Sequence, residues 1–136
     1  MEAKEFLDVA QRLCASHHEA DRRTSVSRAY YAVFNHIKPV LESFGVTFSS
    51  EAHDHTKIYK YLNNAGLEDA ESVAHDLTSL RKIRGRADYD MKYSGFERNN
   101  CLLWYQKAKR CINDFDRVDK KALRKNIGEY RSKINE

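Results

Sequence analysis

The chain has 136 residues, a formal net charge of +4, one Pro and five Gly. This length fits one domain with a real hydrophobic core, and the scarcity of Gly and Pro argues against an all-β fold with its many turns. The mildly basic charge permits a nucleic-acid or nucleotide partner but does not require one.

Apolar residues recur every three or four positions in the first third of the chain, which predicts helices. The first helix is predicted over about residues 3–16. The second begins near residue 21, has the clearest apolar stripe, and ends at Gly45 as a C-terminal cap. Pro39 lies inside the second helix and should kink it, because proline removes a backbone donor.

Residues 46–54 are predicted as a loop, and a third helix with Ile58, Tyr61 and Leu62 on its buried face ends near 63–66. Three further helices are predicted over about residues 67–89, 97–118 and 120–134, with a break at Ser94-Gly95. Short connections between long helices favour antiparallel neighbours. The sequence therefore predicts an all-α, up-down antiparallel helical bundle with an extra C-terminal helix.

The last predicted helix differs from the others in its thin apolar stripe and its many basic residues. We predict a bundle over residues 1–117 and a basic C-terminal helix over 118–136, either part of the same domain or peripheral to it. The basic segment is a candidate contact for a nucleic acid or an acidic partner, although such charges most often form a solvated face. The basic residues of the tail over 117–136 are Arg117, Lys120, Lys121, Arg124, Lys125, Arg131 and Lys133.

The cysteines and the hydropathy pattern indicate the compartment. Cys14, Cys101 and Cys111 are an odd number at wide spacing, which is a poor disulfide framework, so we expect three small buried residues in a reducing cytoplasm. No apolar run precedes the first charges, and no stretch approaches the ~20 apolar residues of a membrane span. We expect a cytoplasmic protein without a membrane partner.

A polar row on the second helix, opposite its apolar stripe, is the first candidate site. Thr24, Arg28, Tyr31 and Asn35 follow each other at helical spacing. A plain solvated face usually carries Lys and Glu, whereas this row offers directional donors and a stacking surface. A packed interface is the alternative, since Tyr and Arg also mark protein interfaces.

The fourth helix carries the second candidate site. Arg84 falls within its apolar arc, and arginine is rarely buried without a partner. Asp88, one turn further, predicts an intrahelical ion pair as the structural interpretation. In the functional interpretation, Arg81, Arg84 and Arg86 form a planar, permanently charged site for phosphate.

A metal site is not expected. His53 and His55 flank Asp54, but no further ligands follow at a helpful spacing, so a polar helix start is the preferred interpretation. The sequence also lacks a glycine-rich phosphate loop, a nucleophile elbow and a paired His-Glu zinc motif. We therefore expect neither a metal nor a cofactor.

Two segments together resemble the HEPN-domain family. Residues 27–34, SRAYYAVF, are similar to that family's SRAYYA-F helix, and residues 80–90, LRKIRGRADYD, resemble its LR---R--ADYD segment. The resemblance covers about residues 1–117 and implies a helical bundle that dimerises. Many members of the family are metal-independent ribonucleases, often toxins paired with a nucleotidyltransferase antitoxin. In these, an Arg and a His separated by four residues meet their counterparts at the dimer cleft.

The chain departs from that ribonuclease motif at the histidine. Counted from Arg84 the position holds Tyr89, and counted from Arg81 it holds Arg86. Asn35 likewise stands where the family usually has a His after the Phe, with His36 next. An Arg can hold the scissile phosphate and a His can move a proton near neutral pH, but Tyr, with an ordinary pKa near 10, is a poor base there.

The resemblance therefore implies a dimeric module that binds a nucleotide or RNA. A nucleotidyltransferase partner, in a toxin–antitoxin or defence system, is implied as well. Arg84 and Tyr89 are the catalytic candidates if catalysis survives. The binding candidates are Arg28, Tyr31, Asn35, Arg81, Arg86 and Asp88.

Two alternatives stay open. The chain could be an active endoribonuclease in which Arg84 holds phosphate while Tyr89, His36 or another His moves protons. It could also be a purely structural dimerisation module, in which the tyrosines and the last helix bury a partner face.

Overall fold

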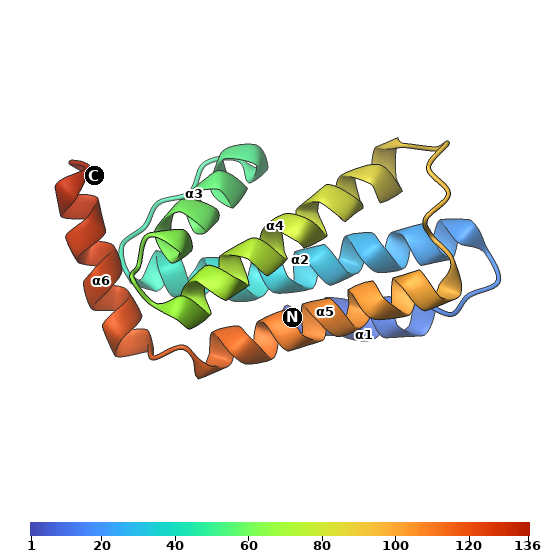
Figure 1. Cartoon of the computed structure of the whole chain (residues 1–136), viewed down its shortest axis with the longest axis horizontal. Helices are drawn as coiled ribbons and strands as arrows, with labels where there is room; N and C mark the ends of the chain where they lie inside the picture. The colour runs from blue at the N-terminus through green and yellow to red at the C-terminus, as the bar shows by residue number, and fades with distance from the viewer.

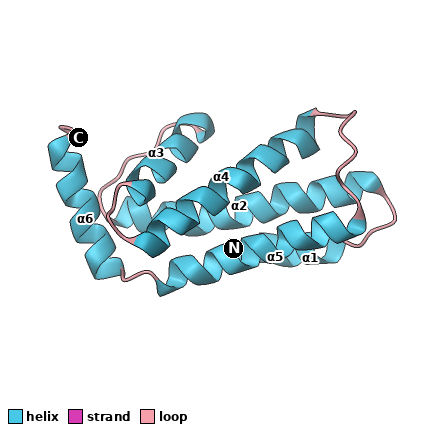
Figure 2. Ribbon diagram, viewed as in Figure 1, coloured by secondary structure: helices cyan, strands magenta, loops and turns pink.

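The helices follow one another with short connections in the computed structural model, which describes residues 1–136 except for the side chain of residue 51. Figure 2 shows helices joined by loops and no strand in this described part of the chain. The helices are α1 (Lys4–Leu13), α2 (Glu19–Ser43), α3 (Glu51–Asn63), α4 (Glu68–Tyr89), α5 (Arg98–Arg117) and α6 (Lys120–Lys133).

The helices run up and down, which confirms the predicted fold class. In Figure 1, α1 and α4 run in one direction along the long axis, and α2 and α5 run in the other. α2 packs against α1, α4 and α5, so it is the central helix of the bundle. α3 packs on α4 near one end, and α6 crosses that same end. The loop over residues 90–97 lies at the opposite end.

The start of α3 corrects one prediction. Residues 51–54 were predicted as loop, but the helix already begins at Glu51. The buried carboxylate of Asp54 accepts a hydrogen bond from the backbone N–H of Ser49 (2.8 Å) and forms an ion pair with Lys38 of α2 (3.1 Å). Because these contacts satisfy the polar side chain, a segment that resembles a loop in sequence forms a helical turn.

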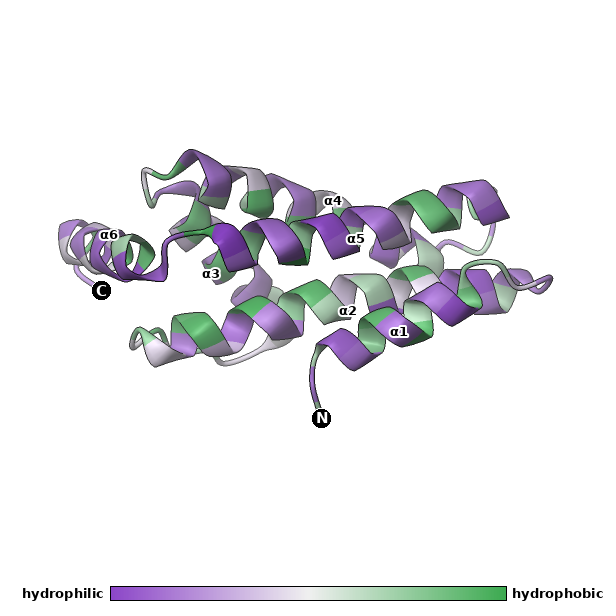
Figure 3. Cartoon of the chain, turned by 90° about the horizontal axis from the view of Figure 1, so that it is seen from below, coloured by the Kyte–Doolittle hydropathy of each residue, from purple (hydrophilic) through white to green (hydrophobic). Residues whose placement is uncertain are grey.

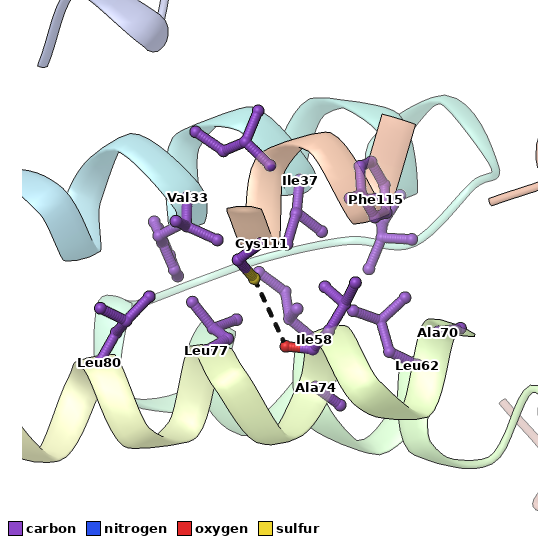
Figure 4. Packing of buried hydrophobic residues seen from close by; sticks show 14 of the residues in the cluster. Val33, Ile37, Ile58, Leu62, Ala70, Ala74, Leu77, Leu80, Cys111 and Phe115 are labelled. Carbon is purple, nitrogen blue, oxygen red and sulfur yellow. Dashed lines mark hydrogen bonds between the residues drawn. The ribbon is translucent and has the colours of Figure 1, made fainter. Parts of the chain in front are cut away.

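Side chains from α2, α3, α4 and α5 meet in the main core (Figure 4). Gly45, with a φ of +92°, ends α2 as predicted. Trp104 of α5 packs against the core but is only partly buried. The labelled core residues are Val33, Ile37, Ile58, Leu62, Ala70, Ala74, Leu77, Leu80, Cys111 and Phe115.

α6 lies against the end of the bundle. Leu123 and Ile127 are buried in the main core, and Tyr130 meets Tyr61 of α3 edge to face, with 6.1 Å between ring centroids. The Asn126 side chain donates a hydrogen bond to the carbonyl of Ala65 (2.7 Å). The rest of α6 is mostly hydrophilic, as Figure 3 shows. A narrow apolar stripe is therefore enough to hold this basic helix on the bundle.

No described helix is long and apolar enough to cross a membrane. No group of three or more His, Cys, Asp or Glu side chains within the described residues could hold a metal ion.

The cysteines are buried and should resist alkylation in the native protein. Burial raises the pKa of the Cys111 thiol to about 12 and that of Cys101 to about 11, and it also raises the pKa of Cys14. The reactive thiolate is therefore scarce at neutral pH. We expect iodoacetamide to label none of the three thiols in native protein and all three after denaturation, as counted by intact mass. Rapid labelling of any thiol in native protein would contradict this.

Candidate functional site

Arg84 of α4 is aimed at α2 and lies against two aromatic rings. Its guanidinium carbon is 5.4 Å from the ring centroid of Tyr30 and 5.5 Å from that of Tyr31. Only 11% of the Arg84 side chain is exposed. The aromatic faces attract the cation and restrict its plane, and this attraction strengthens where water is excluded.

Arg28 approaches Tyr31 as well. Its guanidinium carbon is 5.0 Å from the Tyr31 ring centroid and 4.8 Å from that of Phe6 on α1. Tyr31 and Arg28 are both half-buried. Two guanidinium groups from different helices therefore lie against one tyrosine ring near the surface.

Asp88 supplies the negative charge of this group. Arg84 Nη1 lies 3.6 Å from Asp88 Oδ2, which confirms the predicted intrahelical ion pair. The same carboxylate oxygen accepts a hydrogen bond from Ser27 Oγ on α2 (3.2 Å). Asp88 thus links the end of α4 to α2 and restrains the Arg84 side chain.

His55 of α3 joins the group from the inside of the fold. Its Nδ1 lies 3.2 Å from the hydroxyl of Tyr30, and only 4% of the residue is exposed. Burial lowers the pKa of His55 to about 4, and the positive charges of Arg81 and Arg84 add to the decrease. The imidazole is therefore neutral at physiological pH.

These residues form what we call the Arg84 cluster, and sequence reasoning found all but two of them as site members. Tyr30 was not singled out as a site residue, and His55 was assigned to a polar helix start in preference to a metal site. Nothing in the spacing could have placed His55 beside Arg84, because they lie on different helices. The Arg84 cluster consists of Arg28, Tyr30, Tyr31, His55, Arg84 and Asp88.

The other candidates lie around the cluster or away from it. Asn35 is partly buried one turn beyond Tyr31, and Arg81 is partly buried one turn before Arg84. Arg86 instead stacks on the ring of Tyr93, 4.5 Å from its centroid. Tyr89 is 78% exposed at the end of α4.

His36, a candidate proton carrier of the ribonuclease alternative, faces α5. Its Nε2 lies 2.6 Å from Asp116 Oδ1, and its ring meets that of Phe115 edge to face. Burial by itself would raise the pKa of Asp116, but the hydrogen bonds and positive charges of His36 and Lys4 together lower it. This contact turns His36 toward Asp116 of α5, while the Arg84 cluster is built by α2, α3 and α4.

The cluster is better suited to holding an anion than to transferring protons. Arginine presents a planar fork of donors that matches phosphate oxygens, and both arginines keep their charge at any physiological pH. A buried histidine with a pKa near 4 is a weak base, and the tyrosine hydroxyls are weaker acids than a catalytic histidine.

The comparisons with known proteins identify the family. The family model of the HEPN domain matches residues 1–125, which reaches into α6. No curated protein and no solved structure matches the chain. A HEPN domain indicates a function related to nucleotides or RNA. With most of its length matched by that model, this chain belongs to the HEPN domain family.

Proposed function

We propose that this chain binds a nucleotide or RNA through its phosphates, at the Arg84 cluster. The observation that carries the proposal is the placement of Arg28 and Arg84 against the same half-buried tyrosine, Tyr31. The two guanidinium groups would hold phosphate oxygens, while the ring of Tyr31 offers an apolar surface for a base or ribose.

Recognition is favoured over cleavage because the cluster lacks a base poised near neutral pH. One observation supports the ribonuclease alternative. His55 lies beside Tyr30, and it is close enough to Arg84 for that positive charge to lower the pKa of His55. However, an imidazole that is 4% exposed and has a pKa near 4 takes up protons poorly at pH 7.

The proposal includes a homodimer, as the family resemblance implies. Two large apolar side chains are exposed at the end of α4 and just after it, namely Tyr89 (78%) and Met91 (67%). Such a group is typical of protein interfaces and supports a self-association surface there. A nucleotidyltransferase partner in a toxin–antitoxin or defence system rests on the resemblance alone.

The test is binding and cleavage of a mixed RNA pool in a metal chelator. We expect Arg84→Ala to weaken filter-bound RNA by roughly tenfold or more, since a charge-assisted hydrogen bond to phosphate is worth about 1.5–3 kcal/mol. Arg84→Lys should lose part of the affinity, because lysine keeps the charge but not the planar fork.

The matched control is Arg12→Ala, which removes an exposed arginine of α1. This change should alter binding far less than Arg84→Ala does, and circular dichroism should show that both variants stay folded. Unchanged RNA binding in folded Arg84→Ala would refute the proposal. Cleavage that disappears with Arg84 and with His55→Gln would support the ribonuclease alternative instead.

A further inference from the structure

A second concave surface lies between α4, the 90–97 loop and α5. Two hollows of about 440 and 270 Å³ adjoin there, and both are lined by Tyr93 and Trp104. We call this surface the Trp104 groove. Its charged and aromatic lining residues are Lys82, Arg86, Tyr93, Trp104, Lys107 and Arg110.

The groove faces away from the Arg84 cluster. Arg84 and Arg86 are two positions apart, which separates their directions by about 200° around the helix. Accordingly Arg84 contacts the tyrosines of α2, whereas Arg86 stacks on Tyr93. The groove is therefore a separate site, and its function does not depend on the one proposed for Arg84.

The charge on the groove has one sign. Four cationic side chains line the two hollows, and no described carboxylate lines either of them. One of these cations, Lys107, has a carboxylate partner nearby, because its Nζ lies 3.5 Å from Asp76 Oδ1. A polyanion laid along the groove would thus meet several cations without meeting a line of negative charge.

The aromatic side chains are partly exposed and held in place. Adding a Cβ at Gly95 would overlap the Tyr93 ring, so the absence of a side chain there lets the ring lie across the backbone. The Tyr93 ring also meets Phe96 edge to face, with 5.5 Å between centroids. Trp104 lies at the junction of the two hollows, and Lys107 Nζ is 5.9 Å from its ring centroid.

We propose that the Trp104 groove binds single-stranded nucleic acid. Bases would stack on Trp104 and Tyr93, while phosphates would contact Lys82, Arg86 and the basic residues of α5. The lining of α5 from Asn100 to Arg110 spans about 15 Å along the helix, which suits an extended strand better than one phosphate. An acidic peptide would use the cations but would not stack on the exposed parts of the two aromatic rings, which Arg86 and Lys107 contact as well.

The chain carries its own reporter, because Trp104 is its single tryptophan. We expect an oligouridylate of about 12 nucleotides to quench the tryptophan fluorescence as bases stack on the ring. An oligodeoxythymidylate of equal length serves as the second arm. Quenching by either oligonucleotide supports the proposal. The one that binds with higher affinity shows whether the groove prefers RNA or DNA.

Adjacent residues of α5 provide a matched pair of variants. Arg110→Gln removes a groove cation, and Lys109→Gln removes an exposed cation outside the lining. Only Arg110→Gln should reduce the slope of log affinity against log salt, by about 0.7 for one lost phosphate contact. Gly95→Ala, which displaces Tyr93 without changing charge, should weaken binding by roughly fivefold or more.

The outcomes separate this proposal from that for the Arg84 cluster. Arg84→Ala should leave the quenching at saturation unchanged, whichever way its own test turns out. Binding of the oligonucleotide with no change in Trp104 emission would overturn the groove proposal. Equal quenching by poly-glutamate would overturn it too, since a polyanion without bases would then suffice.

Discussion

Replacing Arg23 with alanine is expected to lower the free energy of unfolding by about 3–5 kcal/mol. Arg23 lies on α2 and is only 6% exposed. Its Nη1 donates to the carbonyl oxygens of Arg86 (3.1 Å), Ala87 (3.1 Å) and Asp90 (2.9 Å), and its Nη2 donates to that of Tyr93 (2.7 Å).

The expected loss of stability is large because these carbonyl oxygens lose a hydrogen-bond donor. The last carbonyls of a helix have no partners within the helix, and Arg23 satisfies those at the end of α4 while opposing the negative end of its dipole. The guanidinium also lies 4.7 Å from the ring centroid of Phe96. Without Arg23, the carbonyls of Ala87 and Tyr93 would lose their donor, whereas those of Arg86 and Asp90 also accept from backbone N–H groups. Each buried acceptor left without a donor costs about 1–3 kcal/mol.

Urea denaturation monitored by circular dichroism would measure the loss. Arg12→Ala on α1 is the control, because Arg12 is exposed and its removal should change stability by no more than about 0.5 kcal/mol. Arg23→Lys should be intermediate, since lysine cannot reach four carbonyls with one planar group. If Arg23→Ala cost no more than Arg12→Ala, this account of the end of α4 would be wrong.

Acidification from about pH 7 to about pH 5 is expected to lower stability by about 2 kcal/mol through His55 alone. The pKa of His55 is lowered to about 4 in the folded protein, against an ordinary value of 6.5 in the unfolded chain. Between these values the unfolded state binds a proton that the folded state does not bind, so falling pH favours unfolding. Above about pH 6.5, His55 is neutral in both the folded and the unfolded protein, so this loss of stability is absent there.

His55→Gln should remove most of this pH dependence, because glutamine does not titrate and its side chain can still bond the Tyr30 hydroxyl. The matched control is His53→Gln, since His53 is exposed two positions earlier on the same helix. Denaturation curves at both pH values would give the comparison. A wild-type protein as stable at pH 5 as at pH 7 would show that His55 is not buried as described.

Much of the fold could be predicted from local sequence. The stripe that includes Val33, Ile37 and Leu41 follows the helical period, and these residues are buried because one face of α2 must leave water. The Arg84–Asp88 pair was predictable for the same reason, since residues four apart meet on any helix. The start of α3 was missed because long-range contacts of Asp54 stabilise a polar helical turn.

The two surfaces that we propose as sites depend on contacts between helices. Helical spacing placed Arg84 on a buried face, but only packing against α2 put it against Tyr30 and Tyr31. From the sequence, Arg86 was grouped with Arg84 as one phosphate site. The same packing instead turned Arg86 toward Tyr93. Such contacts join residues tens of positions apart, and no local period encodes them.

By itself, then, the sequence determined the helices, their buried faces and the family, because these follow from periodicity and from motifs within single helices. Only the tertiary structure decided that His55 is buried beside Tyr30, that Arg23 holds the end of α4, and that Trp104 lines a basic groove. The physical reason is that charge, burial and hydrogen bonding depend on neighbours in space, and those neighbours are set by how the helices pack.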